Sequence, residues 1–117
     1  MLARPDHFDS YGVEPGATPL NLPEGILLIY NGWNAGHVHC TGWALFDKND
    51  PSKLLRRCET SIIQPQFPYE MVHNDRFTFT ESVIFYKGLW RFYYGASDRT
   101  ISVAEVDDIE TLLKAVP

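Results

Sequence analysis

The sequence of 117 residues is 44% hydrophobic and 14% aromatic, which suits one folded domain and leaves no room for two. Its formal net charge is −5, and no basic cluster exists beyond Lys53, Arg56 and Arg57, so a nucleic-acid partner is not expected. No apolar run approaches the roughly 20 residues that span a bilayer, and the N-terminus lacks the order of a signal peptide. We therefore expect a cytoplasmic protein without a membrane partner.

The two cysteines, Cys40 and Cys58, lack metal-site spacing, so they are expected to be free thiols in a reducing compartment, and no cofactor is predicted.

The first predicted elements lie around a buried strand. Residues 12–25 are rich in proline and glycine, which predicts a loop with at most one short strand near residues 17–20. The apolar run of residues 26–30 is typical of a strand buried on both faces, and Asn31-Gly32 is expected to end it in a turn. Residues 37–46 then predict a second, antiparallel strand.

The middle of the chain predicts mostly connections. Residues 47–51, Asp-Lys-Asn-Asp-Pro, form a cluster typical of a turn. Residues 52–57 are compatible with one helical turn. The prolines of residues 65–68 cannot donate to a sheet, so an extended connection is expected there.

The last third predicts a meander of three antiparallel strands. These are residues 76–86, 89–95 and 100–106, joined by Lys87-Gly88 and by residues 96–99. A short helix is expected over residues 107–116, with Asp107 as its cap and Glu110 three residues later. Its apolar side chains would pack on the sheet through Ile109, Leu112 and Leu113.

Together these elements predict an all-β fold of antiparallel meander sheets. The chain would form a single partial propeller-like domain over residues 1–117, with approximate blades at residues 12–60 and 70–106 and a C-terminal helix. Two open blades expose unpaired strand edges and an apolar face, which soluble proteins pair or cover. We therefore expect a homo-oligomer that forms through exposed strand edges.

Four segments, in chain order, resemble the C-terminal part of glycoside hydrolase family 130, which contains β-mannoside phosphorylases and β-1,2-mannosidases built on a five-bladed β-propeller. They are Glu-Gly-Ile-Leu-Leu-Ile-Tyr-Asn-Gly at residues 24–32, residues 44–55, Pro-Tyr-Glu at residues 68–70, and Tyr-Tyr-Gly-Ala-Ser-Asp at residues 93–98. The resemblance covers about the last third of a family member. It implies a mannose-containing glycoside as ligand, and it implies that the family's general acid, an aspartate of the N-terminal half, is not in this chain.

One motif departs from the phosphorylase pattern. Where phosphorylases carry a phosphate-contacting histidine in Tyr-His-Gly, this chain has Tyr30-Asn31-Gly32. Together with the sequence of residues 46–51, Phe-Asp-Lys-Asn-Asp-Pro, this departure places the chain nearer the hydrolytic mannosidases than the phosphorylases.

Asp98 is a candidate for sugar binding. It lies in a predicted hairpin loop, where a carboxylate can accept two sugar hydroxyls beside the apolar surface of Tyr93, Tyr94 and Trp90. The alternative is a turn aspartate that bonds its own backbone. The resemblance favours the sugar contact, because the matching aspartate of the family contacts the mannosyl residue.

Glu81 is the candidate catalytic residue. Strict alternation from Phe77 through Phe79 to Val83 and Phe85 places its carboxylate on the aromatic face of the strand, where desolvation would raise its pKa. The alternative is a bend at residues 81–82 that turns the side chain to solvent. The resemblance suggests a glutamate base in hydrolytic members, without assigning that role to Glu81.

Three further residues complete the predicted sugar site. Asn31 and Trp33 follow the first buried strand and are expected to offer an amide and a stacking ring at the rim, although a turn asparagine is more often structural. Tyr94 is expected to bind sugar together with Asp98. His37 and His39 share a strand face in this prediction, but no third ligand is in view, so no metal site is predicted.

These residues leave three hypotheses open. The chain is a catalytically incompetent part of a mannoside hydrolase or phosphorylase, an oligomeric lectin-like module that binds a sugar without cleaving it, or an enzyme completed by residues of another chain. If it is active, β-mannoside hydrolysis is favoured over phosphorolysis.

Overall fold

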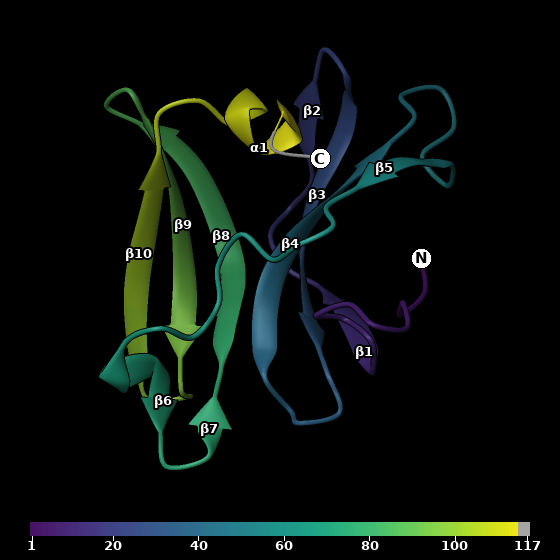
Figure 1. Ribbon diagram of the computed structural model, residues 1–117. Helices are drawn as coiled ribbons and strands as arrows, with labels where there is room; N and C mark the ends of the chain where they lie inside the picture. Colours follow the sequence, from purple (N-terminus) through teal and green to yellow (C-terminus); the bar gives the residue numbers. More distant parts are fainter. Residues whose placement is uncertain (115–117) are drawn as a thin grey trace.

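The computed structural model, which describes residues 1–114, contains two antiparallel sheets that face each other and one short helix (Figure 1). The first sheet has the order β1-β3-β4-β5, with β2 also paired to β3, and the second has the order β10-β9-β8. A two-stranded ribbon, β6-β7, lies beside the second sheet. The elements are β1 Gly12–Pro15, β2 Leu20–Leu22, β3 Gly25–Trp33, β4 His39–Phe46, β5 Leu54–Arg57, the 3-10 helix η1 Pro68–Glu70, β6 Met71–Val72, β7 Asp75–Arg76, β8 Thr78–Tyr86, β9 Leu89–Ala96, β10 Thr100–Val106 and α1 Glu110–Lys114.

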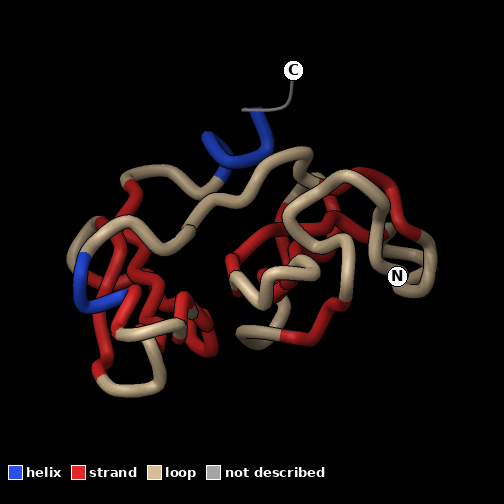
Figure 2. Tube along the Cα trace, turned by 60° about the horizontal axis from the view of Figure 1, so that its bottom comes forward, coloured by secondary structure: helices blue, strands red, loops and turns tan. Residues whose placement is uncertain are grey.

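The core lies around the two central strands of the first sheet. β3 pairs along its whole length with β4, so that Ile29 lies opposite Trp43. Both side chains are at most 1% exposed, and Leu27 is fully buried. The apolar run of residues 26–30 therefore forms the buried strand that its composition predicts. Figure 2 shows the strands gathered in two groups.

Two local predictions for the first sheet are wrong. Asn31 and Gly32 do not form a turn, because β3 continues to Trp33, with β1 paired on one side and β4 on the other. Residues 54–57 form the strand β5 instead of a helical turn, because β4 offers them a partner. In both places pairing with a distant segment overrides the local signal.

The meander of the second sheet is confirmed. β9 pairs with β8 on one side and with β10 on the other, and the turn between β8 and β9 holds Lys87 and Gly88 at positive φ values of 51° and 78°. The all-β class and the antiparallel sheets are likewise confirmed.

The C-terminal helix differs from its prediction in its cap. The backbone N–H of Glu110 donates to the Asp108 carboxylate at 2.9 Å, so Asp108 and not Asp107 caps α1. Ile109 and Leu113 are buried in the core, and Leu112 packs against it, as expected. Residues 115 and 116 of the predicted helix lie outside the described residues.

The second sheet leaves an apolar face exposed. Ile101 is 83% exposed, and Tyr93, Val103, Ile84 and Tyr86 are also accessible. Homo-oligomerisation through the outer strands stays a prediction. Over residues 1–114, no helix is long and apolar enough to cross a bilayer.

Candidate functional site

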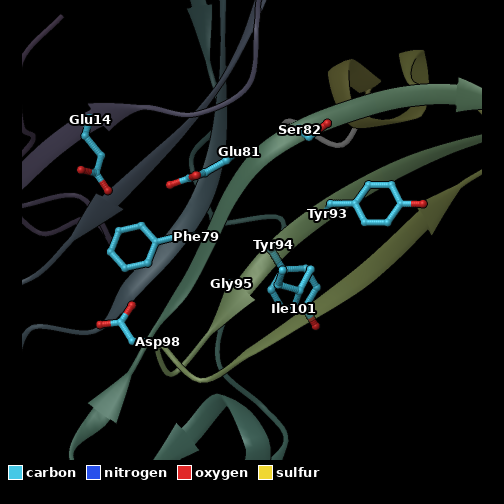
Figure 3. A pocket seen from close by; sticks show the side chains of 9 residues that line it. All are labelled: Glu14, Phe79, Glu81, Ser82, Tyr93, Tyr94, Gly95, Asp98 and Ile101. Atoms are coloured by element: carbon cyan, nitrogen blue, oxygen red, sulfur yellow. The ribbon is translucent and has the colours of Figure 1, made fainter.

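A pocket of about 510 Å³ lies on the second sheet and extends to β1 of the first (Figure 3). Three of the residues that line it carry carboxylates, and its apolar wall includes an aromatic ring. The lining residues are Glu14, Phe79, Glu81, Ser82, Tyr93, Tyr94, Gly95, Asp98 and Ile101.

Asp98 lies in a tight turn between β9 and β10. Ser97 and Asp98 have φ values of 50° and 55°, and the N–H of Arg99 donates to the carbonyl of Ala96 at 3.0 Å, which is the pattern of a type I′ turn. The turn is anchored from below, since the Ser97 hydroxyl donates to the carbonyl of Asp75 at 2.5 Å. Within residues 1–114, the Asp98 carboxylate makes no hydrogen bond. The alternative of a turn aspartate bonded to its own backbone therefore does not hold.

Glu81 lies in a β-bulge. Thr80 pairs with Tyr94 and Ser82 pairs with Tyr93, so Glu81 is an extra residue on β8 without a partner on β9. Its side chain is exposed, so the predicted burial on an aromatic face is wrong, because the extra residue of the bulge interrupts the alternation on which that prediction depends. The bulge nevertheless directs Glu81 into the pocket.

Glu14 is a site residue that the sequence analysis missed. It lies on β1 opposite Asn31, and Figure 3 shows its carboxylate and that of Glu81 pointing into the same space. Partial burial raises the pKa of Glu14, and the negative charge of Glu81 raises it further. A segment assigned to a loop gives no side-chain direction, so no sequence signal identified this residue.

Asn31 does not reach the pocket. Its side chain is fully buried, and both ends of its amide bond Thr80, with Nδ2 donating to the Thr80 carbonyl at 3.0 Å and Oδ1 accepting from the Thr80 N–H at 2.9 Å. The Thr41 hydroxyl donates to the same Oδ1 at 3.0 Å. The expected sugar contact through this amide finds no support in the geometry. The departure of Tyr30-Asn31-Gly32 from the Tyr-His-Gly pattern stays a prediction.

Trp33 lies at the end of β3, next to the pocket but not in its wall. Its ring stacks on the ring of His39, with 5.2 Å between the ring centroids. The His39 ring in turn packs against Phe77 and Phe79, at centroid distances of 4.6 and 4.7 Å. Burial lowers the pKa of His39. This aromatic cluster supports Phe79, which carries the apolar wall of the pocket.

Tyr94 contributes its body to the pocket wall but not its hydroxyl. The hydroxyl donates to the Glu70 carboxylate at 2.6 Å, and Glu70 is 2% exposed. The other carboxylate oxygen of Glu70 accepts from the backbone N–H groups of Gln66 and Phe67. Burial and the nearby Glu70 carboxylate raise the pKa of Tyr94.

His37 lies in the turn before β4, with φ of 58°, so it does not share a strand face with His39 as predicted. In the part of the chain that the structure describes, no group of three metal-ligating side chains is found. Both cysteines are free, as expected, and both are buried.

Comparison with known proteins agrees with the fold. A family model described as beta-1,4-mannooligosaccharide phosphorylase, of glycoside hydrolase family 130, matches residues 3–116. The beta-1,2-mannobiose phosphorylases of Listeria innocua and of a Thermoanaerobacter species are 31% and 34% identical to this chain over 115 and 110 residues. The matches cover 93% and 92% of this chain but only 31% and 36% of those proteins.

Solved structures agree as well. The Listeria innocua phosphorylase in complex with beta-1,2-mannobiose matches with a TM-score of 0.92 and 29% identity, over 99% of this chain and 33% of that one. A glycosyl hydrolase from Bacteroides ovatus matches with a TM-score of 0.85 and 33% identity, over 90% of this chain and 32% of its own. The chain spans about a third of the length of these relatives.

Proposed function

Because this chain belongs to glycoside hydrolase family 130, we propose that the pocket lined by Phe79, Glu81 and Asp98 binds the mannosyl residue of a β-mannoside. The observation that carries the proposal is the Asp98 carboxylate, which lies in the pocket wall without a hydrogen bond from residues 1–114. A carboxylate accepts hydrogen bonds from two neighbouring sugar hydroxyls, and the ring of Phe79 offers an apolar surface to the pyranose.

The charge of the pocket favours a neutral sugar. Glu14, Glu81 and Asp98 carry negative charge, and the described residues of the lining include no lysine, arginine or histidine. Phosphate or an acidic sugar would be repelled at this place. The negative charge of the pocket therefore supports water, and not phosphate, as the molecule that accepts the mannosyl group. It thus favours the hydrolytic members of the family over the phosphorylases.

We further propose that the pocket belongs to a mannoside-cleaving site that needs residues from outside this chain. Glu81 is the candidate for proton transfer, and the resemblance assigns the general acid to another part of the family fold. The alternative is a lectin-like module that binds the sugar without cleaving it, and the exposed position of the Glu81 side chain favours this alternative. Turnover of a β-mannoside separates the two.

The exposed strand edges and Ile101 support assembly with further copies or with a partner chain. Light scattering on the purified chain gives its mass in solution, and a discrete oligomer is expected. A monomer would contradict the proposal of self-assembly and leave the pocket proposal to its own test.

Calorimetry with β-1,2-mannobiose tests the sugar site. We expect saturable binding that weakens about 10- to 100-fold in Asp98→Ala, the loss expected for charge-assisted hydrogen bonds. Asp107→Ala is the control, because it removes the same charge at the opposite end of β10. Release of mannose with and without phosphate tests cleavage in the same samples. The absence of saturable binding in the wild-type chain would overturn the proposal.

A further inference from the structure

We infer that Asn31 is a positioning residue of the pocket: its side-chain amide closes the open edge of β8 at Thr80 and thereby fixes the bulge that carries Glu81. The importance of Glu81 for a sugar rests on the proposed function, whereas the positioning itself does not. Three features of the structure support this role: the open edge of β8, the orientation of the Asn31 amide, and the position of Glu81 directly after Thr80.

The first feature is the edge of the second sheet. β8 is an outer strand in the order β10-β9-β8, so the backbone groups on its far side lack a neighbouring strand within the described sheet. At Thr80 the Asn31 amide takes the place of that strand, since it accepts from the Thr80 N–H at 2.9 Å and donates to the Thr80 carbonyl at 3.0 Å. These are the two bonds that a peptide group of a paired strand would make.

The second feature is the orientation of the amide, which the backbone of Thr80 fixes and with which the hydroxyl of Thr41 agrees. The Thr41 hydroxyl donates to Asn31 Oδ1 at 3.0 Å and lies 2.8 Å from the Thr80 hydroxyl, which therefore donates to Thr41. Asn31, Thr41 and Thr80 are all 0% exposed. A buried amide with every partner in place has one orientation, because turning it over would set donor against donor.

The third feature is the position of Glu81 directly after the clamped residue. Thr80 is held on one side by its pairing with Tyr94 and on the other side by Asn31, and the register shifts at the next residue. Thr80 also lies close to Gly16, which directly follows β1 of the first sheet. A Cβ atom at Gly16 would lie only 2.6 Å from the Thr80 carbonyl oxygen, so no larger residue fits between them. The peptide that leads into Glu81 is thus fixed by the first sheet, and Glu81 is directed into the pocket opposite Glu14 (Figure 3).

Asn31→Leu tests this role, because leucine has a similar volume and cannot make either bond to Thr80. Thr41→Val is the matched control, since it removes a hydroxyl from the same buried cluster and leaves both bonds between Asn31 and Thr80 in place. Carbon-detected NMR of the carboxyl groups reports where Glu81 lies, because the charge of Glu81 contributes to the raised pKa of Glu14.

In Asn31→Leu we expect the pKa of Glu14 to fall and the affinity for β-1,2-mannobiose to drop about tenfold, the loss of one charge-assisted contact. In Thr41→Val the pKa of Glu14 and the affinity for β-1,2-mannobiose should match those of the wild type, although the melting temperature is lower. Unchanged titration of Glu14 in a folded Asn31→Leu protein would overturn the inference. If the wild-type chain binds no mannobiose while the Glu14 titration still responds, the proposed function fails and the positioning role stands.

A measurement on the unaltered chain covers the case in which Asn31→Leu does not fold. The amide proton of Thr80 should exchange with solvent as slowly as that of Phe92, which lies in the central strand β9. Fast exchange at Thr80 would show that Asn31 does not hold this edge, and it would overturn the inference.

Discussion

Replacing Asp9 by asparagine tests the buried network that holds the N-terminal segment against the first sheet. The Asp9 side chain is 0% exposed and accepts hydrogen bonds from the Tyr30 hydroxyl at 2.6 Å, from Arg57 Nη2 at 2.7 Å and from Arg4 Nη2 at 3.1 Å. Asparagine has the shape of the Asp9 side chain but not its negative charge. Its side-chain NH2 group is itself a donor, so it cannot accept the hydrogen bonds that Tyr30, Arg57 and Arg4 donate. The Arg57 side chain, which is 8% exposed, then keeps a buried charge without its carboxylate.

The expected loss follows from that unpaired charge. Removing one partner of a buried ion pair costs about 3–5 kcal/mol. Because asparagine retains one acceptor, we expect a loss of about 3 kcal/mol, which corresponds to a melting temperature lower by roughly 10–15 °C in a domain of this size. That is a large share of a total stability of about 5–15 kcal/mol.

The same network predicts a pH dependence. Burial by itself raises the pKa of Asp9, but the hydrogen bonds from Tyr30 and Arg4 and the charges of Arg57 and Arg4 outweigh it and hold this pKa below its usual range. The stabilisation is therefore fully present above the unfolded pKa of about 3.9 and is lost as the pH falls through the folded value. Below about pH 4, Asp9→Asn should lose less stability on acidification than the wild type.

Thermal unfolding followed by tryptophan fluorescence, at pH 7 and between pH 2 and 5, measures both effects. Asp6→Asn is the matched control, because Asp6 is exposed and lies in the same segment at a φ of 65° that asparagine tolerates. Equal melting temperatures for Asp9→Asn and Asp6→Asn at pH 7 would refute the reasoning.

Three further predictions concern the pocket and the core. Tyr94→Phe should lower the free energy of unfolding in urea by about 1–3 kcal/mol, because Glu70 loses a buried hydrogen-bond donor. The affinity for mannobiose should hardly change, and a large loss of affinity would show that the Tyr94 hydroxyl contacts the sugar. Gly95→Ala should leave the melting temperature unchanged, because the added Cβ meets no atom within 4 Å, but it should weaken mannobiose binding measured by calorimetry, since Gly95 lines the pocket. Burial raises the pKa of Cys40 to about 11 and also raises that of Cys58, so neither thiol of the folded chain should react with iodoacetamide at pH 8, whereas mass spectrometry should find both alkylated in guanidinium.

The strands that sequence reasoning predicted well are those with a strong local pattern. β3, β8, β9 and β10 carry apolar or aromatic runs bounded by turn residues, and β8, β9 and β10 pair with one another in a meander. The composition of β1 predicts a loop and that of β5 a helical turn, because the pairing that makes them strands comes from their partners, β3 and β4. Such strands are determined by contacts that the local sequence does not contain.

The site follows the same rule. The sequence predicts the turn that holds Asp98 because this turn lies between two recognisable strands. The direction of Glu81 was judged from alternation, which an extra residue in the ladder interrupts. Asn31 was placed in a turn because its partner, Thr80, is 49 residues away, and Glu14 was missed because a loop gives no face.

Assigned NMR spectra of the chain titrated with β-1,2-mannobiose test the central claim most directly. If the pocket binds a mannosyl residue, the resonances of Phe79, Glu81 and Asp98 shift together and saturate, and Asp98→Ala weakens that response. No saturable shift, or shifts confined to residues away from this pocket, would contradict the assignment of the pocket as a sugar site.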